Sequence, residues 1–390
     1  MKVLVLGAGG LQAKAAVYDL SLSTDVSEIV CADSKLDTIA DLKRFADEKK
    51  FRGVKIDVTD FEKLKSLLID TDIAIDLLPR TFKELVCEAA IETHTSVVNT
   101  NYTYDMSRYE KRAKDAGIAI MCECGLDPGI DLVIYNKAIH KFDEIHLLNS
   151  YCGGFPEKSA CDNPLNYKIS WTWEGVLSST KRDATAIKNG IKVSIPADDQ
   201  HRPDYINTID FPALGLLEAI PNGDAIYFTD LLGISEKIQE TGRYSLRWPG
   251  WSAIWDPLKK LGFLDTEPVN GLPCAVTPYQ FLDKFLGPRL QYKDNEKDLV
   301  AMINVFEGIS GGKQVRLTST ILIERSLDTG LMAMSKGVGY PASIVAQMIN
   351  NREITAKGIL TPALHVPWEP FMEKLSERGI VINEKEEFLN

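Results

Sequence analysis

The chain has 390 residues, of which 45% are hydrophobic and 25% charged, and its formal net charge is −11. This length predicts two or three domains, and the composition excludes a disordered, collagen-like or low-complexity chain. The acidic balance argues against binding to nucleic acid or to an anionic membrane surface, because both require basic patches. It remains compatible with a small anionic ligand, since a few arginines in a cleft can dominate locally.

The cysteines and the start of the chain indicate the compartment. Seven cysteines are present, an odd number, and no spacing is typical of a disulfide framework or a zinc site. We therefore expect no metal and a reducing environment. No signal peptide precedes the first apolar run, and no run reaches the roughly 20 apolar residues that span a bilayer. The sequence thus predicts a soluble, cytoplasmic protein.

The first 33 residues have the order of a dinucleotide-binding unit. Residues 2–6 form a nearly all-apolar run, which is typical of a strand buried on both faces. A glycine-rich turn follows at 7–12, then a helical segment at 13–20 and a second strand at 27–32 that ends in Asp33. Strand, glycine turn, helix, strand and acid together predict a Rossmann-type fold.

The residue types in this unit suit a pyrophosphate. Gly7 permits the tight turn, Gly9 allows close approach of the backbone, and the helix N-terminus offers N–H groups. Asp33, at the end of the second strand, is expected to bind the ribose hydroxyls and to repel a 2′-phosphate, which favours NAD over NADP. Gln12 stands where a third glycine is usual, and Gly10 could supply part of the missing space. The predicted cofactor-binding residues are Gly7, Gly9, Gly10, Leu11, Gln12, Asp33, Ser34 and Leu78.

The following segments continue the alternation of strands and helices. Helical stretches at 81–91 and 109–116 separate further strands, which we expect at 54–60, 72–79, 96–99 and 118–122. Such alternation predicts a doubly wound parallel sheet with its ligand at the carboxyl ends of the strands. Leu78 follows the fourth of these strands, beside the expected path of the cofactor.

The pattern changes after residue 124, and a second, α+β domain is expected. Its predicted strands lie at 143–152, 192–196, 224–228 and 314–323. A C-terminal helix is expected at 368–378, followed by a charged, frayed tail after residue 382. We predict a dinucleotide-binding domain at 1–124, a substrate domain at 125–335 and a helical C-terminal segment at 336–390.

Several longer motifs in this second half are distinctive. They are Cys124-Gly-Leu-Asp-Pro-Gly-Ile-Asp131, Ser150-Tyr-Cys-Gly-Gly-Phe-Pro156, Asp162-Asn-Pro-Leu-Asn-Tyr-Lys-Ile-Ser-Trp171, Ser245-Leu-Arg-Trp-Pro-Gly250 and Val338-Gly-Tyr-Pro341. Together they resemble the saccharopine dehydrogenase (L-glutamate-forming) family, to which lysine 6-dehydrogenases are close relatives. The resemblance covers nearly the whole chain.

This resemblance implies an NAD(P)-dependent oxidoreductase that acts on a CH–NH bond. It would oxidise saccharopine to an imine, which is hydrolysed to L-glutamate and 2-aminoadipate 6-semialdehyde, or run in reverse. The resemblance also implies a homodimer, formed through the substrate domain, and a C-terminal segment that packs near the first domain. Alternatives are an L-lysine 6-dehydrogenase, a carboxynorspermidine dehydrogenase or a catalytically silent NAD-binding sensor.

The resemblance also suggests the site residues. Tyr102, Asp127 and Cys152 are expected to face one crevice and to manage the proton transfers at nitrogen and water. The alternatives are that Tyr102 packs in a core, that Asp127 caps a helix, and that Cys152 is a small buried hydrophobe. Asn163 and Tyr167 belong to the motif at 162–171 and are expected to contact substrate.

Saccharopine carries three carboxylates, so its site should be locally cationic. Arg247 is the leading candidate because arginine binds a planar carboxylate in bidentate fashion. Lys168 is the second candidate, and it could shuttle a proton if it is desolvated. The alternative for each is a surface charge, although both lie in apolar-aromatic tracts. No histidine lies in a motif, so we propose no histidine base.

Overall fold

The computed structural model describes residues 1–389 and divides into two compact units. The first unit comprises Met1–Lys137 together with Met334–Val381. The second comprises Ala138–Ala333 together with the residues from Ile382. Each unit is built on a sheet of its own.

The sheet of the first unit is parallel throughout. Its strands are β1 (Lys2–Leu6), β2 (Glu28–Asp33), β3 (Phe51–Lys55), β4 (Ile73–Asp76), β5 (Ser96–Asn99), β6 (Ala119–Met121) and β15 (Gly358–Leu360). They are hydrogen bonded in the order β15-β6-β5-β4-β1-β2-β3. The order of strands reverses at β1, between β2 and β4, and a doubly wound fold binds its ligand at the carboxyl ends beside such a reversal.

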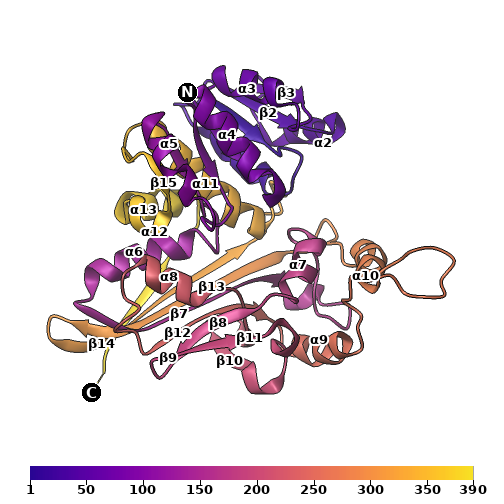
Figure 1. Cartoon of the computed structure of the whole chain (residues 1–390), viewed down its shortest axis with the longest axis vertical. Helices are drawn as coiled ribbons and strands as arrows, with labels where there is room; N and C mark the ends of the chain where they lie inside the picture. Colours follow the sequence, from indigo (N-terminus) through magenta and orange to yellow (C-terminus); the bar gives the residue numbers. More distant parts are fainter. Residues whose placement is uncertain (390) are drawn as a thin grey trace. The chain divides into compact units, whose positions relative to one another are not determined.

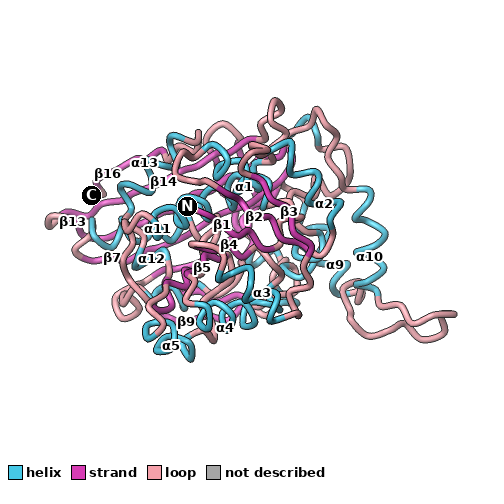
Figure 2. The backbone as a smooth tube through the Cα atoms, turned by 90° about the horizontal axis from the view of Figure 1, so that it is seen from above, coloured by secondary structure: helices cyan, strands magenta, loops and turns pink. Residues whose placement is uncertain are grey.

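Helices cover both faces of this sheet (Figure 2). The helices of this unit are α1 (Ala13–Leu22), α2 (Leu36–Ala40), α3 (Phe61–Ile69), α4 (Lys83–Thr93), α5 (Glu110–Asp115), α12 (Pro362–His365) and α13 (Trp368–Glu377), together with most of α6 (Ile130–Lys141) and α11 (Ala333–Asn350). One core joins Leu64 of α3, Val86 of α4 and Ala113 of α5 to strand residues such as Leu4 and Val30. None of the described helices is both long and apolar enough to cross a membrane.

The second unit contains a mixed sheet whose longest strands lie at its centre (Figure 1). Its elements are β7 (Glu144–Pro156), α7 (Trp173–Ser179), β8 (Ala184–Lys188), β9 (Ile191–Ile195), β10 (Asn207–Phe211), β11 (Gly215–Pro221), α8 (Ala225–Leu231), β12 (Glu240–Arg247), α9 (Trp251–Lys260), α10 (Pro278–Leu286), β13 (Asp298–Ser310), β14 (Lys313–Glu324) and β16 (Asn383–Phe388). The main order is β10-β11-β12-β7-β13-β14-β16, with β8 and β9 joined at β12. The β12–β7 pair is parallel and the other pairs are antiparallel.

The two faces of this sheet differ in character. Tyr151, Phe155 and Ile303 pack into an aromatic core with residues of α7 and α9, among them Trp173 and Trp255. The opposite face carries the alternate residues of the same strands, because successive side chains of a strand point to opposite sides. The loop between α9 and α10 projects away from the rest of this unit (Figures 1 and 2).

Three predicted elements differ from the structure. The run at 224–228, predicted as a strand, is the start of α8, because the Asp224 side chain accepts a hydrogen bond from the Tyr227 N–H and caps the helix. The tail after residue 382, predicted to be frayed, forms β16 against β14. The third strand lies at Phe51–Lys55, earlier than predicted, and Asp60 caps α3.

Candidate active site

The glycine turn after β1 has the geometry of a cofactor cradle. Gly7 has a φ of +71°, and a Cβ there would lie 2.8 Å from the Leu77 carbonyl oxygen at the end of β4. The Gly10 N–H donates to the Gly7 carbonyl and closes the turn at 3.0 Å. Leu78, whose N–H donates to Asp76, follows directly, so the carboxyl ends of β1 and β4 meet here.

The Asp33 carboxylate is held by the loops around it. One oxygen, Oδ2, accepts a hydrogen bond from the Gly9 N–H at 2.9 Å. The other, Oδ1, accepts from the Lys35 N–H at 3.1 Å and from the Ser34 hydroxyl at 3.3 Å. All three of these hydrogen bonds come from neighbouring loop residues of the same chain. Asp33 therefore shapes the glycine turn and the end of β2.

Helix α11 supplies contacts to α1 that sequence reasoning missed. The Ser335 hydroxyl donates to the Leu11 carbonyl at 2.8 Å and accepts from the Ala15 N–H in the first turn of α1. A Cβ at Gly339 would lie 2.6 Å from the Ala16 nitrogen and 2.8 Å from the Gln12 carbonyl oxygen. The close packing that a third glycine of the turn usually allows is thus provided by Gly339, from the other end of the chain.

This cradle fits a dinucleotide. The turn brings the backbone of β1, β2 and β4 together at their carboxyl ends, where a side chain at Gly7 could not fit. The Gln12 Oε1 atom is buried and has no hydrogen-bond partner among the described residues, so a ligand hydroxyl could complete it. All eight predicted cofactor residues lie in or beside this turn.

A buried glutamate fixes the loop that carries Tyr102. Glu123 is fully buried, and its Oε1 accepts hydrogen bonds from the N–H and the hydroxyl of Thr103 at 3.1 and 3.0 Å. Its Oε2 accepts from the Thr361 hydroxyl at 2.7 Å, just before α12. The ring of Tyr102 stacks on Tyr104 at 5.1 Å. The sequence signal for Glu123 was an acid between two cysteines at a strand end.

Asp127 lies in the turn that precedes α6. The helix begins at Ile130, and the peptide bond between Asp127 and Pro128 is cis. The backbone N–H of Gly129 donates at 2.7 Å to Asp131, not to Asp127. Burial raises the pKa of Asp131 to about 8, so this carboxyl holds its proton more firmly than an exposed one.

Cys152 lies near the middle of the second sheet. It is paired with Ser245 of β12 on one side and with Met302 of β13 on the other. Its side chain is 7% exposed, on the face opposite the aromatic core of this unit.

Arg247, at the end of β12, is a buried cation. Its guanidinium lies 5.3 Å from the ring centre of Tyr167 and 5.2 Å from that of Trp251. Its Nη1 donates to the Leu246 carbonyl, whereas its Nε has no partner among the described residues. Burial lowers the pKa of Arg247. The nearby side chains of Tyr167, Cys152 and Tyr292 raise the pKa of Arg247, and none of these three side chains is a carboxylate.

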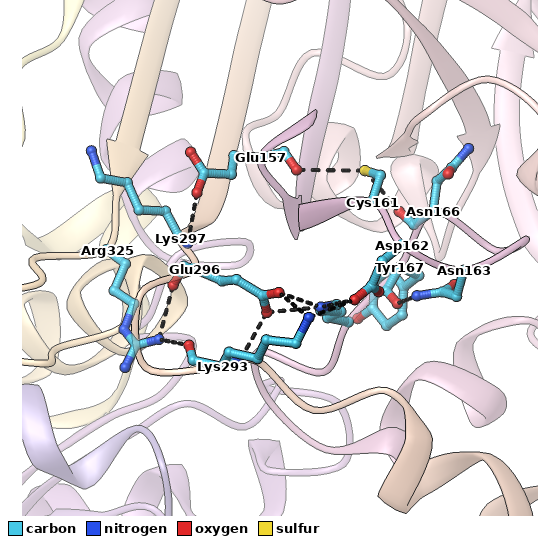
Figure 3. A network of polar contacts seen from close by, with 11 residues as sticks. Glu157, Cys161, Asp162, Asn163, Asn166, Tyr167, Lys293, Glu296, Lys297 and Arg325 are labelled. Carbon is cyan, nitrogen blue, oxygen red and sulfur yellow. Dashed lines mark hydrogen bonds and ion pairs between the residues drawn. The ribbon is translucent and has the colours of Figure 1, made fainter. Parts of the chain in front are cut away.

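Lys168 is also buried, and its ammonium contacts two acids, Asp162 and Glu296, which are labelled in Figure 3. Its ammonium donates to both oxygens of Glu296 at 2.8 and 2.7 Å and to Asp162 at 3.0 Å. Lys293 also contacts both acids. Hydrogen bonds from Lys168 and Lys293 lower the pKa of Asp162 to about 2. This geometry favours a charged, structural lysine over a proton shuttle.

Asn163 and Tyr167 shape the same loop (Figure 3). The Asn163 amide donates to the Tyr167 carbonyl at 2.9 Å and accepts from the Leu165 N–H at 3.1 Å. The Tyr167 hydroxyl is buried near the Trp171 side chain, and burial raises its pKa. The structure therefore places the predicted residues in two groups: Tyr102 and Asp127 in the first unit, and Cys152, Asn163, Tyr167, Lys168 and Arg247 in the second.

Comparison with known proteins gives matches along the whole chain. Residues 3–121 match the saccharopine dehydrogenase NADP binding domain, and residues 125–380 match the saccharopine dehydrogenase C-terminal domain. The chain is 29% identical to saccharopine dehydrogenase [NADP(+), L-glutamate-forming] of Saccharomyces cerevisiae, over 98% of each chain. The solved apo structure of the histidine-tagged, L-Glu-forming enzyme from this yeast superposes with a TM-score of 0.85, at 27% identity, over 99% of each chain.

A longer relative is the mitochondrial alpha-aminoadipic semialdehyde synthase of Mus musculus, which is 28% identical over 98% of this chain. The chain spans about half of that protein, since the match covers 47% of it.

These matches correct the predicted cofactor. The domain matched by residues 3–121 is described as NADP binding, and the yeast and Pyricularia oryzae relatives are named as NADP(+) enzymes. The expectation that Asp33 selects NAD is therefore wrong. Asp33 accepts hydrogen bonds from Gly9, Ser34 and Lys35, so this acid shapes the turn, and its presence does not by itself determine the cofactor.

Both halves of the chain match the corresponding halves of one family, and the family model of the second half alone covers more than half of the chain. The chain belongs to the saccharopine dehydrogenase family.

Proposed function

We propose that this protein is an NADP-dependent oxidoreductase that acts on the CH–NH bond of saccharopine. It oxidises saccharopine to an imine, which water hydrolyses to L-glutamate and 2-aminoadipate 6-semialdehyde, or it runs this reaction in reverse. The full-length match to saccharopine dehydrogenase of yeast supports the proposal.

Arg247 is the observation that carries the proposal. A buried guanidinium normally has a carboxylate partner, because an unpaired charge in a protein interior is strongly unfavourable. Arg247 has aromatic neighbours and a backbone carbonyl, but no carboxylate of the described residues forms an ion pair with it. A carboxylate of the substrate would supply the missing partner. Saccharopine has three carboxylates, which suits a site built on a buried arginine.

The chain's residues then divide the work. The glycine turn and the start of α1 bind the pyrophosphate of NADP, whose nicotinamide accepts or supplies the hydride. Arg247 holds a substrate carboxylate. Asp127, Cys152 and Tyr102 are proposed to control the proton at the substrate nitrogen and the water that attacks the imine. Glu123 positions the loop of Tyr102, and Lys168 holds the loop of Tyr167.

We further propose a homodimer in the cytoplasm. An apolar hollow of about 290 Å³ lies beside the loop between α9 and α10, and Phe263, Leu272 and Phe281 around it are 39–50% exposed. Such an exposed apolar patch supports contact with a second copy. None of the seven cysteines, all of which lie in the described part of the chain, forms a disulfide bond, and this supports a reducing compartment.

The test is the near-ultraviolet absorbance of NADPH. The purified chain is mixed with NADP⁺ and saccharopine, and parallel reactions contain lysine in place of saccharopine, or NAD⁺ in place of NADP⁺. We expect NADPH to form with saccharopine and NADP⁺. Oxidation of lysine but not of saccharopine would replace this proposal with an L-lysine 6-dehydrogenase. Cofactor binding without turnover of either substrate would favour a sensor.

A further inference from the structure

A row of polar side chains crosses the second sheet on the face that carries Cys152. Strand register places Arg243 of β12 opposite Ser150 of β7, and Ser150 opposite Asn304 of β13. Directly opposed residues point to the same face, with Cβ atoms about 5 Å apart. Cys152 lies two residues beyond Ser150 on β7, so it shares this face.

Two members of the row are buried and lack hydrogen bonds. Asn304 is 0% exposed and Ser150 is 1% exposed. Neither amide atom of Asn304 nor the hydroxyl of Ser150 has a partner among the described residues. A buried amide without partners is costly, because it has lost its hydrogen bonds to water and gained none. Proteins retain such groups where a ligand or an ordered water completes them.

The next position of the row shows the contrast. Ser319 of β14 lies opposite Asn304 and is also fully buried, yet its hydroxyl donates to Glu384 of β16 at 3.3 Å. At the other end, the guanidinium of Arg243 lies 4.4 Å from the ring centre of Phe228. The chain therefore completes the hydrogen bonding of Ser319 but not that of Ser150 and Asn304.

The chemistry of the row matches the head group of an α-amino acid. A carboxylate can accept from the guanidinium of Arg243 and the hydroxyl of Ser150. An ammonium can donate to the side-chain oxygen of Asn304, whose NH₂ group can donate to the same carboxylate. Arginine, serine and asparagine side by side thus offer both donors and an acceptor within about 10 Å, the span of two cross-strand pairs.

We propose that Arg243, Ser150 and Asn304 bind the free α-amino-acid end of the substrate. This inference rests on the proposed function, because saccharopine has one such end, which becomes the amino-acid end of 2-aminoadipate 6-semialdehyde. The reacting nitrogen lies five bonds from its α-carbon. Ser150 and Cys152 are about 6.6 Å apart along the strand, a similar length.

The proposal predicts that variants of the row change the KM for one substrate and not the KM for the other. In the direction of saccharopine formation, Asn304→Leu should raise the KM for 2-aminoadipate 6-semialdehyde by at least about tenfold and leave the KM for L-glutamate within about twofold. Ser150→Ala should act in the same direction but more weakly. Ser319→Ala is the matched control from the same row and should leave both constants unchanged. Thermal melting of each variant is measured in parallel.

The melting temperature distinguishes a binding role from a structural one. Leucine replaces the unpartnered amide with an apolar group of the same branched shape, so Asn304→Leu should melt close to or above the temperature of the wild type. A variant that is equally or more stable but binds the semialdehyde poorly supports the proposal. A variant with unchanged KM values would show that a water completes the row, and would overturn the proposal. If Asn304→Leu fails to fold, the KM values of Ser150→Ala decide.

A binding measurement keeps this inference separate from the proposed function. Calorimetry with L-2-aminoadipate and NADPH tests the row without turnover. Binding to the wild type that Asn304→Leu abolishes supports the row, even if the chain does not oxidise saccharopine. A wild-type chain that does not bind this probe would overturn the row. If the chain oxidises saccharopine and Asn304→Leu keeps the KM values of the wild type, the proposed function is supported and the proposed binding role of the row is overturned.

Discussion

The two units form their candidate sites by different means. In the first unit the backbone does most of the work: Gly7 lies against the end of β4, and Gly339 lies against α1. In the second unit buried charges dominate, and two cations behave differently. Lys168 contacts two carboxylates, whereas within residues 1–389 Arg247 pairs with a backbone carbonyl and aromatic rings and with no carboxylate. Burial alone therefore does not reveal the role of a charged side chain; its role is indicated by whether the chain supplies a partner of opposite charge.

Replacing Lys168 with methionine should have a large effect on stability, because Lys168 is the buried cation that contacts two carboxylates. Lys168→Met leaves Glu296 and Asp162 without their main donor, and removing one partner of a buried ion pair destabilises a protein by about 3–5 kcal/mol. We expect the free energy of unfolding in urea to fall by a value near the lower end of that range, because Asp162 is partly exposed. The KM for saccharopine should change little.

Two further variants control this experiment. Lys297→Met removes an exposed lysine that pairs with Glu324, and it should alter stability by less than about 1 kcal/mol. Glu296→Gln combined with Lys168→Met removes both buried charges and should recover part of the lost stability. A stable Lys168→Met variant with greatly reduced turnover would instead support the proton-shuttle role.

Arg247→Met tests whether the second buried cation binds the substrate. Methionine keeps much of the packing against Tyr167 and Trp251 but removes the charge, so we expect the KM for saccharopine to rise about 100-fold, which equals about 2.7 kcal/mol. Stability should be unchanged or higher, because the buried guanidinium has no carboxylate to lose. Arg316→Met, at an exposed arginine of β14 paired with Glu307, is the control. An unchanged KM would remove Arg247 from the substrate site.

The fold of the first unit could be predicted further than that of the second. Buried parallel strands such as residues 2–6 and 96–99 have apolar centres, and both form as predicted. The run at 224–228 is also short and apolar, and periodicity cannot separate helix from strand at that length. Strand β16 is almost entirely polar and exposed, so only its pairing with β14 reveals it.

The candidate site shows the same limit. Arg247 could be proposed from sequence because an arginine in an aromatic tract is unusual. Glu123, Ser335 and Gly339 could not, because their roles depend on contacts with segments distant in sequence. The expectation about Asp33 failed for this reason as well. The position of Asp33 at the end of a strand can be predicted from the sequence, but the hydrogen bond that its carboxylate accepts from the Gly9 N–H cannot.

Gly339→Ala tests the backbone packing of the first unit. A Cβ there would collide with the Ala16 nitrogen and the Gln12 carbonyl, which must shift the start of α1. We expect the dissociation constant of NADPH, followed by its fluorescence, to rise about tenfold, or 1.4 kcal/mol. At saturating NADP⁺ the KM for saccharopine should stay constant. Gly287→Ala, where the new Cβ would meet only Trp173 at 3.9 Å, is the control. Unchanged NADPH affinity would show that α1 does not depend on this contact.

The smallest effect is a pH dependence of the Lys168 cluster. The pKa of Asp162 is lowered to about 2 from an ordinary value of 3.8, and that of Glu296 is lowered too. A lowered pKa in the folded state means that the stabilisation is present above about pH 4 and is lost as the pH falls toward 2. In Lys168→Met the two acids lose this donor, so the stability gap between wild type and variant should narrow below about pH 4. Urea unfolding at a series of pH values measures the gap. If it stays constant down to about pH 3, the lysine does not stabilise the fold through these two carboxylates.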